Sequence, residues 1–231
     1  MKIKAGLAAL LIAGAGAVPA GAQDWARTVA FEDGGHVIGN PEAETRIVEF
    51  MSYTCSHCAK FAREGEPAIR LAVVPTGNYA FEIRHLLRDP VDLSAALLAH
   101  CGDPGKFPMN HTGILARFDD WMERAQNATD AQKARWSFGS NAARRRAIAS
   151  DLGLTEIMES RGYSRVEIDR CLSDETKASA MVEQSQTDME SYGVRGTPSF
   201  AIDGELLDGV HSWQALEPVL RRIDVAKRSA N

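Results

Sequence analysis

The chain has 231 residues, with 31 acidic and 26 basic side chains and a formal net charge of −5. This length suits one large domain, or one domain that carries an insertion. The acidic balance gives no reason to expect nucleic acid or an anionic membrane surface as a partner.

Residues 1–22 have the pattern of a secretory signal peptide. Lys2 and Lys4 precede an apolar stretch from Ala5 to Val18, and Ala20-Gly21-Ala22 offers a small-residue cleavage site. An uncleaved membrane anchor is the alternative, but the apolar run is short for a membrane span and rich in Gly and Ala. Cleavage would leave a formal charge of 24 − 31 = −7. We therefore expect export to the periplasm, an oxidising compartment in which disulfides persist.

The segment before residue 46 is predicted to be largely irregular. Residues 23–34 show no periodic pattern, and residues 36–41 form an approach segment that ends at the turn Asn40-Pro41. The short, β-branched run from Arg46 to Met51 then predicts a buried strand.

A helix and a second strand complete a β-α-β unit. The helix is predicted from Cys55 to about Val74, with Thr54 as its N-cap and a kink or break at Pro67. The alternation of side chains over Tyr79–His85 predicts the second strand.

Residues 91–192 differ from the preceding segment in composition. Nearly every window there is rich in helix-forming residues at helical spacing. The predicted helices are Val91–Cys101, His111–Gln126, Ala142–Leu152, Thr155–Arg161, Arg165–Leu172 and Asp174–Tyr192. Trp121, Trp136 and Phe138 are expected to lie in the core of this helical block.

A β-β-α unit closes the chain. Ser199–Ile202 predicts a strand, Asp203-Gly204 a hairpin turn, and residues 205–207 the returning strand. Ser212 would cap a final helix from Trp213 to about Lys227.

This order of elements predicts an α/β protein, a thioredoxin fold with a helical insertion between its β-α-β and β-β-α halves. Residues 23–90 and 193–231 would form the thioredoxin-like domain, and residues 91–192 the inserted helical domain.

The motif Cys55-Ser56-His57-Cys58 lies where the first predicted strand gives way to a helix. A cysteine at a helix N-terminus is stabilised as the thiolate, the form that attacks a disulfide. His57 would stabilise the Cys55 thiolate further through charge or a hydrogen bond. The alternative is a soft metal site, but Cys55, His57 and Cys58 on one helical turn cannot easily close a tetrahedral site alone. We therefore expect a redox couple and no metal.

The remaining histidines give no support for a metal site, because they show no ligand spacing relative to one another. They are His36, His85, His100, His111 and His211.

The chain resembles the DsbA family of exported thiol–disulfide oxidoreductases over essentially its whole length after the signal peptide. The motifs that carry the resemblance are Gly39-Asn40-Pro41, Val48-Glu49-Phe50, Cys55-Ser56-His57-Cys58 and Gly196-Thr197-Pro198. A Cys-x-x-Cys after a strand, followed much later by Thr-Pro before another strand, is far more specific than Cys-x-x-Cys alone.

The resemblance implies a role for each of these residues. Cys55 would attack, and the more buried Cys58 would resolve the mixed disulfide. Pro198 would be cis and lie with Thr197 beside the cysteines, where the backbone pairs with substrate. Glu49 would lie beneath the disulfide and assist proton transfer to the buried cysteine; a strand-edge surface glutamate is the alternative.

The resemblance also implies the partners. The protein would donate its Cys55–Cys58 disulfide to reduced cysteine pairs of exported proteins, without a further cofactor. A DsbB-like, quinone-linked membrane oxidase would reoxidise it. A monomer is favoured, because only a short segment precedes the first predicted strand, whereas isomerase relatives usually carry an N-terminal dimerisation domain.

Two departures leave the direction of exchange open. Ser56 stands where oxidant members commonly have proline, and Thr197 matches a residue seen in isomerase-type relatives. A disulfide isomerase or reductase of the same fold is therefore the main alternative, and a chaperone module is a further one.

Cys101 and Cys171 lie outside any Cys-x-x-Cys and both fall in the helical block. In an oxidising compartment, such a leftover pair suggests a second, structural disulfide, and one branch of the family has a comparable bond. Two free buried cysteines are the alternative.

Overall fold

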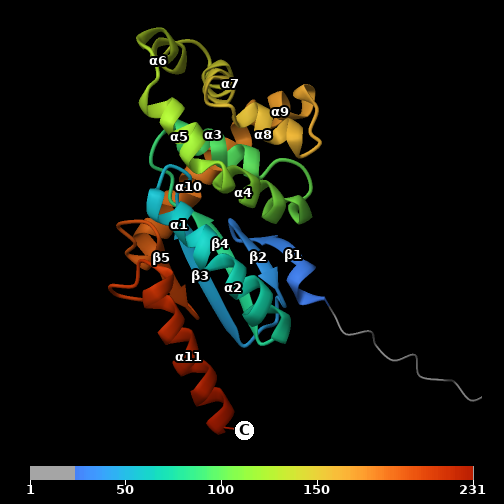
Figure 1. Ribbon diagram of the computed structural model, residues 1–231, viewed down its shortest axis with the longest axis vertical. Helices are drawn as coiled ribbons and strands as arrows, with labels where there is room; N and C mark the ends of the chain where they lie inside the picture. The colour runs from blue at the N-terminus through green and yellow to red at the C-terminus, as the bar shows by residue number, and fades with distance from the viewer. Residues whose placement is uncertain (1–23, 231) are drawn as a thin grey trace, which may run out of the picture.

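The structure, a computed structural model, describes residues 24–230. At its centre is a six-stranded sheet in the order β1-β2-β4-β3-β5-β6 (Figure 1). The strands are β1 (Val29–Glu32), β2 (Gly35–Gly39), β3 (Thr45–Met51), β4 (Tyr79–His85), β5 (Ser199–Ile202) and β6 (Glu205–Leu206). Strands β3 and β4 pair in parallel, and the other neighbours pair antiparallel. The predicted strands β3, β4 and β5 are therefore confirmed.

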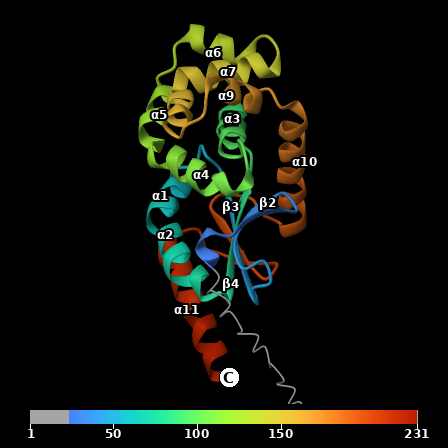
Figure 2. The ribbon, with the colours of Figure 1, turned by 90° about the vertical axis from the view of Figure 1, so that its right-hand side faces the viewer.

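Helices cover both faces of this sheet, which explains why its central strands β3 and β4 are buried along nearly their whole length. Helices α1 (Ser56–Glu64), α2 (Glu66–Ala68) and α11 (Trp213–Ala230) lie on one face, and α10 (Glu175–Tyr192) runs along the other (Figure 2). Ile47 and Phe50 of β3 and Phe81 of β4 are fully buried between these layers.

The remaining helices gather over one end of the sheet, at the opposite end of the molecule from the end of α11 (Figures 1 and 2). They are α3 (Pro90–Ala99), α4 (Phe107–Ala116), α5 (Phe118–Gln126), α6 (Asp130–Ser137), α7 (Asn141–Leu152), α8 (Leu154–Ser160) and α9 (Arg165–Leu172). The predicted α/β fold class, a thioredoxin fold with an inserted helical block, is confirmed.

The N-terminal part is more regular than predicted. Strands β1 and β2 form a hairpin whose turn is Asp33-Gly34, with φ of 45° and 87°. Gly34 tolerates this left-handed backbone because it has no Cβ. The prediction of an irregular segment over residues 23–34 was therefore wrong.

The helix after the cysteine motif differs in detail from the prediction. Its N-cap is Cys55 rather than Thr54, and it ends at Gly65, two residues before Pro67. A Cβ on Gly65 would clash with the ring of Phe61, so the close packing at the break requires glycine. Pro67 falls in the first turn of α2, where its missing N–H leaves no bond unmade.

The helical block contains one helix that the sequence reading missed. Helix α6 begins at a capping box in which the Thr129 side chain and Gln132 bond each other's backbone N–H. Trp121 is buried as predicted, but the expectation for Phe138 was wrong, because 76% of it is exposed. Trp136 is half-buried, and its indole N–H donates to Asp151 at 2.8 Å. Trp136 lies in α6 and Phe138 directly follows it. No residue of α6 is fully buried.

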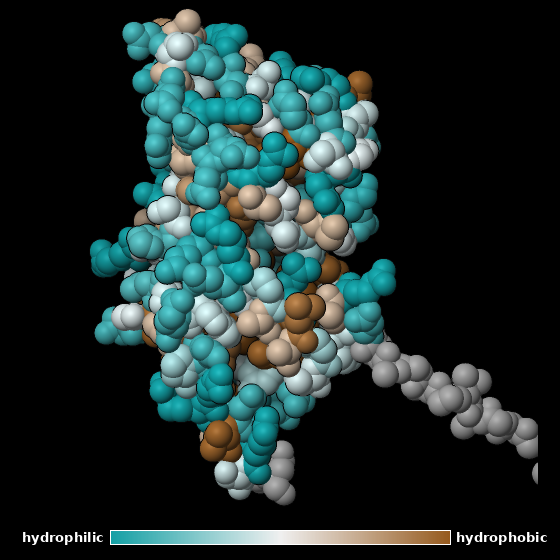
Figure 3. Space-filling view, in the orientation of Figure 1, coloured by the Kyte–Doolittle hydropathy of each residue, from teal (hydrophilic) through white to brown (hydrophobic). Residues whose placement is uncertain are grey.

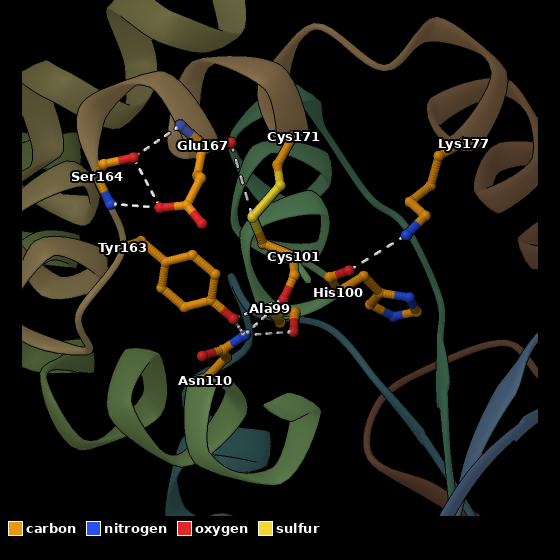
Figure 4. The surroundings of a disulfide bond; sticks show 9 residues. All are labelled: Ala99, His100, Cys101, Asn110, Tyr163, Ser164, Glu167, Cys171 and Lys177. Carbon is orange, nitrogen blue, oxygen red and sulfur yellow. Dashed lines mark hydrogen bonds between the residues drawn. A yellow bond between two sulfur atoms is a disulfide. The ribbon is translucent and has the colours of Figure 1, made fainter. Parts of the chain in front are cut away.

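A disulfide joins Cys101, just after α3, to Cys171 in α9, with their Cα atoms 5.6 Å apart (Figure 4). The carbonyl of Cys101 accepts hydrogen bonds from the Tyr163 hydroxyl at 2.6 Å and from Asn110 Nδ2 at 3.1 Å. The disulfide thus joins α9, near the end of the helical block, to the segment that follows α3, the first helix of the block.

The face shown in Figure 3 is mostly hydrophilic over the helical block, and hydrophobic residues gather lower down, near α2 and the sheet. Over residues 24–230, no helix is both long enough and apolar enough to cross a membrane. The predicted signal peptide, residues 1–22, lies outside the described residues.

Candidate active site

Cys55 lies at the point where the sheet meets helix α1. A short turn leads from the end of β3 at Met51 to Cys55, which is the N-cap of α1. The residue is 5% exposed, and its Sγ lies 3.2 Å from the carbonyl oxygen of Thr197. Cys58, one helical turn further on, is fully buried, and both residues are thiols in this structure.

A buried carboxylate holds the turn before Cys55 in place. Asp92, in the first turn of α3, accepts hydrogen bonds from Ser52 Oγ at 2.6 Å, from the Tyr53 N–H at 2.8 Å and from the Arg88 N–H at 3.0 Å. Burial raises the pKa of Asp92 to about 7, while these three donors oppose the shift. The sequence reading missed this residue, although an acid among the apolar residues of a predicted helix was visible.

The electrostatics around Cys55 favour its thiolate. A hydrogen bond from the Cys58 thiol is the main reason why the pKa of Cys55 is lowered to about 5. Burial opposes the shift, whereas the backbone N–H groups of Cys58 and His57 add to it, as expected at a helix N-terminus.

The second cysteine has the opposite preference. Burial raises the pKa of Cys58 well above its usual range, and the hydrogen bond to Cys55 and the nearby charge of Glu49 act in the same direction. The thiolate is thus favoured at Cys55 and the thiol at Cys58, an asymmetry that suits a thiol–disulfide exchange site.

Glu49 lies in the middle of β3 and is 1% exposed, so it is not a surface residue. Neither of its carboxyl oxygens has a hydrogen-bond partner among the described residues. Burial, followed by the nearby Glu66 and Cys55, raises the pKa of Glu49 well above its usual range. An unpaired buried carboxyl group is far less costly when it is neutral, so burial favours the protonated form of Glu49.

The loop before β5 completes the site. The Thr197–Pro198 peptide bond is cis, as expected. Strand β5 pairs with β3, with Ser199 opposite Phe50, and this pairing brings Thr197 next to Cys55 although the two are 142 positions apart.

A cleft of about 700 Å³ opens over Cys55, between the start of α1 and the loop that carries Thr197. The His57 side chain is exposed and lines this cleft, together with Leu87 and Met189. The imidazole has no hydrogen-bond partner among the described residues, so its expected effect on the Cys55 thiolate stays a prediction.

Two groups of buried histidines were missed. His111 hydrogen-bonds Tyr53 at 2.8 Å through Nδ1 and Glu66 at 2.8 Å through Nε2, which forms a buried chain behind the cysteine motif. The Nε2 atoms of His85 and His100 lie 2.8 Å apart. Sequence spacing does not indicate these contacts, because the fold brings the side chains together.

Within the part of the chain that the structure describes, no group of three or more His, Cys, Asp and Glu side chains is arranged to hold a metal ion.

The fold and the paired cysteines define a thioredoxin-type exchange protein, and comparison with known proteins agrees. The thioredoxin family model matches residues 32–222. The chain therefore belongs to the thioredoxin family.

Two sets of relatives are informative. A crystal structure of a protein-disulfide isomerase from Novosphingobium aromaticivorans is 43% identical, covers 82% of this chain and 97% of that one, and superposes with a TM-score of 0.78. Wolbachia pipientis alpha-DsbA1, 20% identical over 80% of this chain and 88% of its own, shares the fold with a TM-score of 0.64.

A Rickettsia conorii protein, whose name of protein-disulfide oxidoreductase is provisional, is 28% identical over 77% of this chain. The match covers 56% of that protein, so this chain spans little more than half the length of the curated relatives it matches.

Proposed function

We propose that this protein is a periplasmic disulfide donor that oxidises cysteine pairs in exported proteins. The observation that carries the proposal is the asymmetry of the two cysteines. A thiolate at Cys55 stabilises the reduced form, since its pKa is lowered to about 5. A protein whose reduced form is stabilised gives up its disulfide readily.

The proposed reaction is a pair of thiol–disulfide exchanges. A client thiolate attacks Cys55 Sγ of the Cys55–Cys58 disulfide, and Cys58 leaves with the electron pair of the broken S–S bond. The second client thiolate then attacks the client sulfur of the mixed disulfide and expels Cys55 as a thiolate. The client loses two electrons and two protons. The protein gains the two electrons and ends with a Cys55 thiolate and a Cys58 thiol, so one proton is taken up at Cys58 and the other is released to solvent.

The surrounding residues have proposed roles in these steps. Glu49 supplies the proton that Cys58 takes up as it leaves. Burial favours the protonated form of Glu49, and the carboxyl group lies near enough to Cys58 for its ionised form to raise the pKa of that thiol. The His57 imidazole stabilises negative charge on Cys55 from the cleft. Thr197 and Pro198 present the backbone beside which an extended client segment lies.

The proposal includes the compartment and the redox partner. The Cys101–Cys171 disulfide supports an oxidising compartment, since structural disulfides are rare in reducing ones. Residues 1–22 would be the signal peptide that delivers the protein there as a monomer. A DsbB-like membrane oxidase would reoxidise the Cys55–Cys58 dithiol.

A disulfide isomerase is the second candidate. It is favoured by Thr197 and by the 43% identity to the protein-disulfide isomerase from Novosphingobium aromaticivorans. The two functions differ in the state of the protein that acts, because a donor works as the disulfide and an isomerase works as the dithiol.

The test is to add the oxidised protein to a reduced two-cysteine client, and the reduced protein to a scrambled multi-disulfide client. The proposal expects stoichiometric oxidation of the first and little rescue of the second. Cys55→Ser should abolish oxidation, whereas Cys58→Ser should trap mixed disulfides when it is supplied as a mixed disulfide with a small thiol. Full activity of Cys55→Ser would refute the proposal.

A further inference from the structure

The cleft over Cys55 has an unusual charge for this chain. Its charged side chains are Arg88 and Arg195, with His57 as a third basic group, and among the described residues no acidic side chain lines it. The chain as a whole has a formal net charge of −5. The cleft is therefore basic although the chain as a whole is acidic, so its charge does not follow from the overall composition.

The two arginines reach the cleft from separate parts of the fold. Arg88 lies in the loop between β4 and α3, and Arg195 lies in the loop between α10 and β5, two residues before Thr197. Both are exposed. Among residues 24–230, neither guanidinium group has an ion-pair or hydrogen-bond partner, although many other arginines of the chain are paired.

The nearest acid by sequence does not neutralise the cleft. The Asp89 carboxylate caps α3 by accepting from the Val91 and Asp92 N–H groups, and it also accepts from Thr54 Oγ1 at 3.1 Å. Asp89 lines the two adjoining cavities of the helical block, which Arg88 also lines, but it does not line the cleft over Cys55. Two guanidinium groups that are unpaired among the described residues thus line the same cleft as Cys55.

From these observations we infer that the protein prefers clients with carboxylate side chains next to the reactive cysteine, and that Arg88 and Arg195 bind them. This inference rests on the proposed function and adds the substrate class to it. Arginine suits this task because its planar guanidinium group pairs with a carboxylate through two parallel hydrogen bonds.

The experiment uses three reduced two-cysteine peptides that differ only beside the cysteines, with Asp and Glu, Asn and Gln, or Lys and Arg. The readout is the second-order rate constant for oxidation of each peptide by the oxidised protein. Each value is divided by the rate of the same peptide with an uncharged small disulfide, because flanking carboxylates also change the reactivity of the peptide thiols.

Wild-type protein should oxidise the acidic peptide about tenfold faster than the neutral one after this correction, since each exposed ion pair contributes about threefold. Arg88→Gln and Arg195→Gln should each reduce the ratio about threefold, and the double variant should abolish it. Arg88→Lys with Arg195→Lys should retain part of the preference, and Arg88→Glu with Arg195→Glu should transfer it to the basic peptide.

Arg222→Gln is the matched control, because it removes the same charge from an exposed arginine on α11, outside the cleft. The ratio should be unchanged in this variant. At about 1 M salt, where exposed charges are strongly screened, the wild-type preference should largely disappear.

The ratio separates the two possible failures. If the wild type oxidises all three peptides at equal corrected rates, the inference is wrong while the proposed function stands. If it oxidises none of them, the proposed function itself fails. A loss of folding in any variant changes all three rates together and leaves the ratio intact.

Discussion

The Sγ atom of Cys55 lies 3.2 Å from the carbonyl oxygen of Thr197, which places the start of helix α1 against the loop that precedes β5. The contact joins the two halves of the thioredoxin-like sheet across the helical insertion. It also leaves the outward side of the Cys55 sulfur open to the cleft of about 700 Å³. Chemistry at Cys55 therefore depends on two segments of the chain at once.

The first prediction concerns the thiolate of Cys55. In the reduced protein, thiolate absorbance and the rate of alkylation should both titrate with a midpoint near the pKa of about 5. Because this pKa is lower in the folded than in the unfolded chain, the reduced form is stabilised above the unfolded value of about 9, and this advantage declines as the pH falls toward 5. Denaturant unfolding of the reduced and oxidised forms at several pH values measures this difference in stability. A midpoint near 9 would contradict the account.

The second prediction concerns Glu49→Gln, which keeps the shape of the side chain and removes its titration. The folded state raises the pKa of Glu49 above the usual 4.5, so the wild type loses stability as the pH rises through the interval above 4.5. The variant should therefore have a larger free energy of unfolding than the wild type at pH 8, and the difference between the two should be smaller near pH 4. The gain amounts to about 1.4 kcal/mol for each unit by which the pKa is raised.

Glu49→Gln should also slow the release of Cys58 when a client attacks Cys55, because Cys58 then lacks its proton donor. The pH profile of the exchange rate should show one ionisation fewer than that of the wild type. The midpoint for alkylation of Cys55 should move only slightly. An unchanged pH profile would show that the carboxyl group takes no part in proton transfer.

The third prediction concerns Asp92→Ala. The substitution leaves the buried N–H of Tyr53 without its acceptor and frees Ser52 Oγ and the Arg88 N–H. Each buried donor left unsatisfied costs about 1–3 kcal/mol, so we expect a loss of about 3 kcal/mol in the free energy of unfolding. Asp208→Ala, at an exposed position, is the control and should change stability by less than about 0.5 kcal/mol. Equal effects of the two substitutions in urea unfolding would argue against this role for Asp92.

The fourth prediction concerns the disulfide of the helical block. Replacing both Cys101 and Cys171 by alanine opens a loop that spans 70 residues. The loop-entropy relation gives a loss of roughly 4 kcal/mol, which thermal or denaturant unfolding can measure. The reduction potential of Cys55–Cys58 should stay unchanged, because the second disulfide belongs to the helical block. A shift of that potential would instead reveal coupling between the two bonds.

Much of the fold could be predicted because its local signals agree with one another. The strand at Ser199–Ile202 and the helix at Arg165–Leu172 were predicted with their observed bounds, since apolar runs and caps mark both ends. The β1–β2 hairpin was missed even though its Asp33-Gly34 turn carries the same signal as Asp203-Gly204. Its first strand is only partly buried, so the alternation that marks a strand is weak there.

The cysteine motif and Glu49 could be found from the sequence because they lie on one strand and the helix that follows it. The contacts of Asp92 and His111 could not, because these residues reach Tyr53, in the turn before the motif, only once the helical block has packed against the sheet. Tertiary packing decides which backbone N–H each buried carboxylate accepts from, and this pairing cannot be predicted from the spacing of residues in the sequence.

The most direct test of the account is the reduction potential of the Cys55–Cys58 pair, measured by equilibrating the protein with glutathione buffers at neutral pH. A stabilised Cys55 thiolate predicts a value between about −120 and −180 mV, the range of proteins that donate or rearrange disulfides. A value near about −270 mV would place the protein with thioredoxin-like reductants and would contradict its role as a disulfide donor.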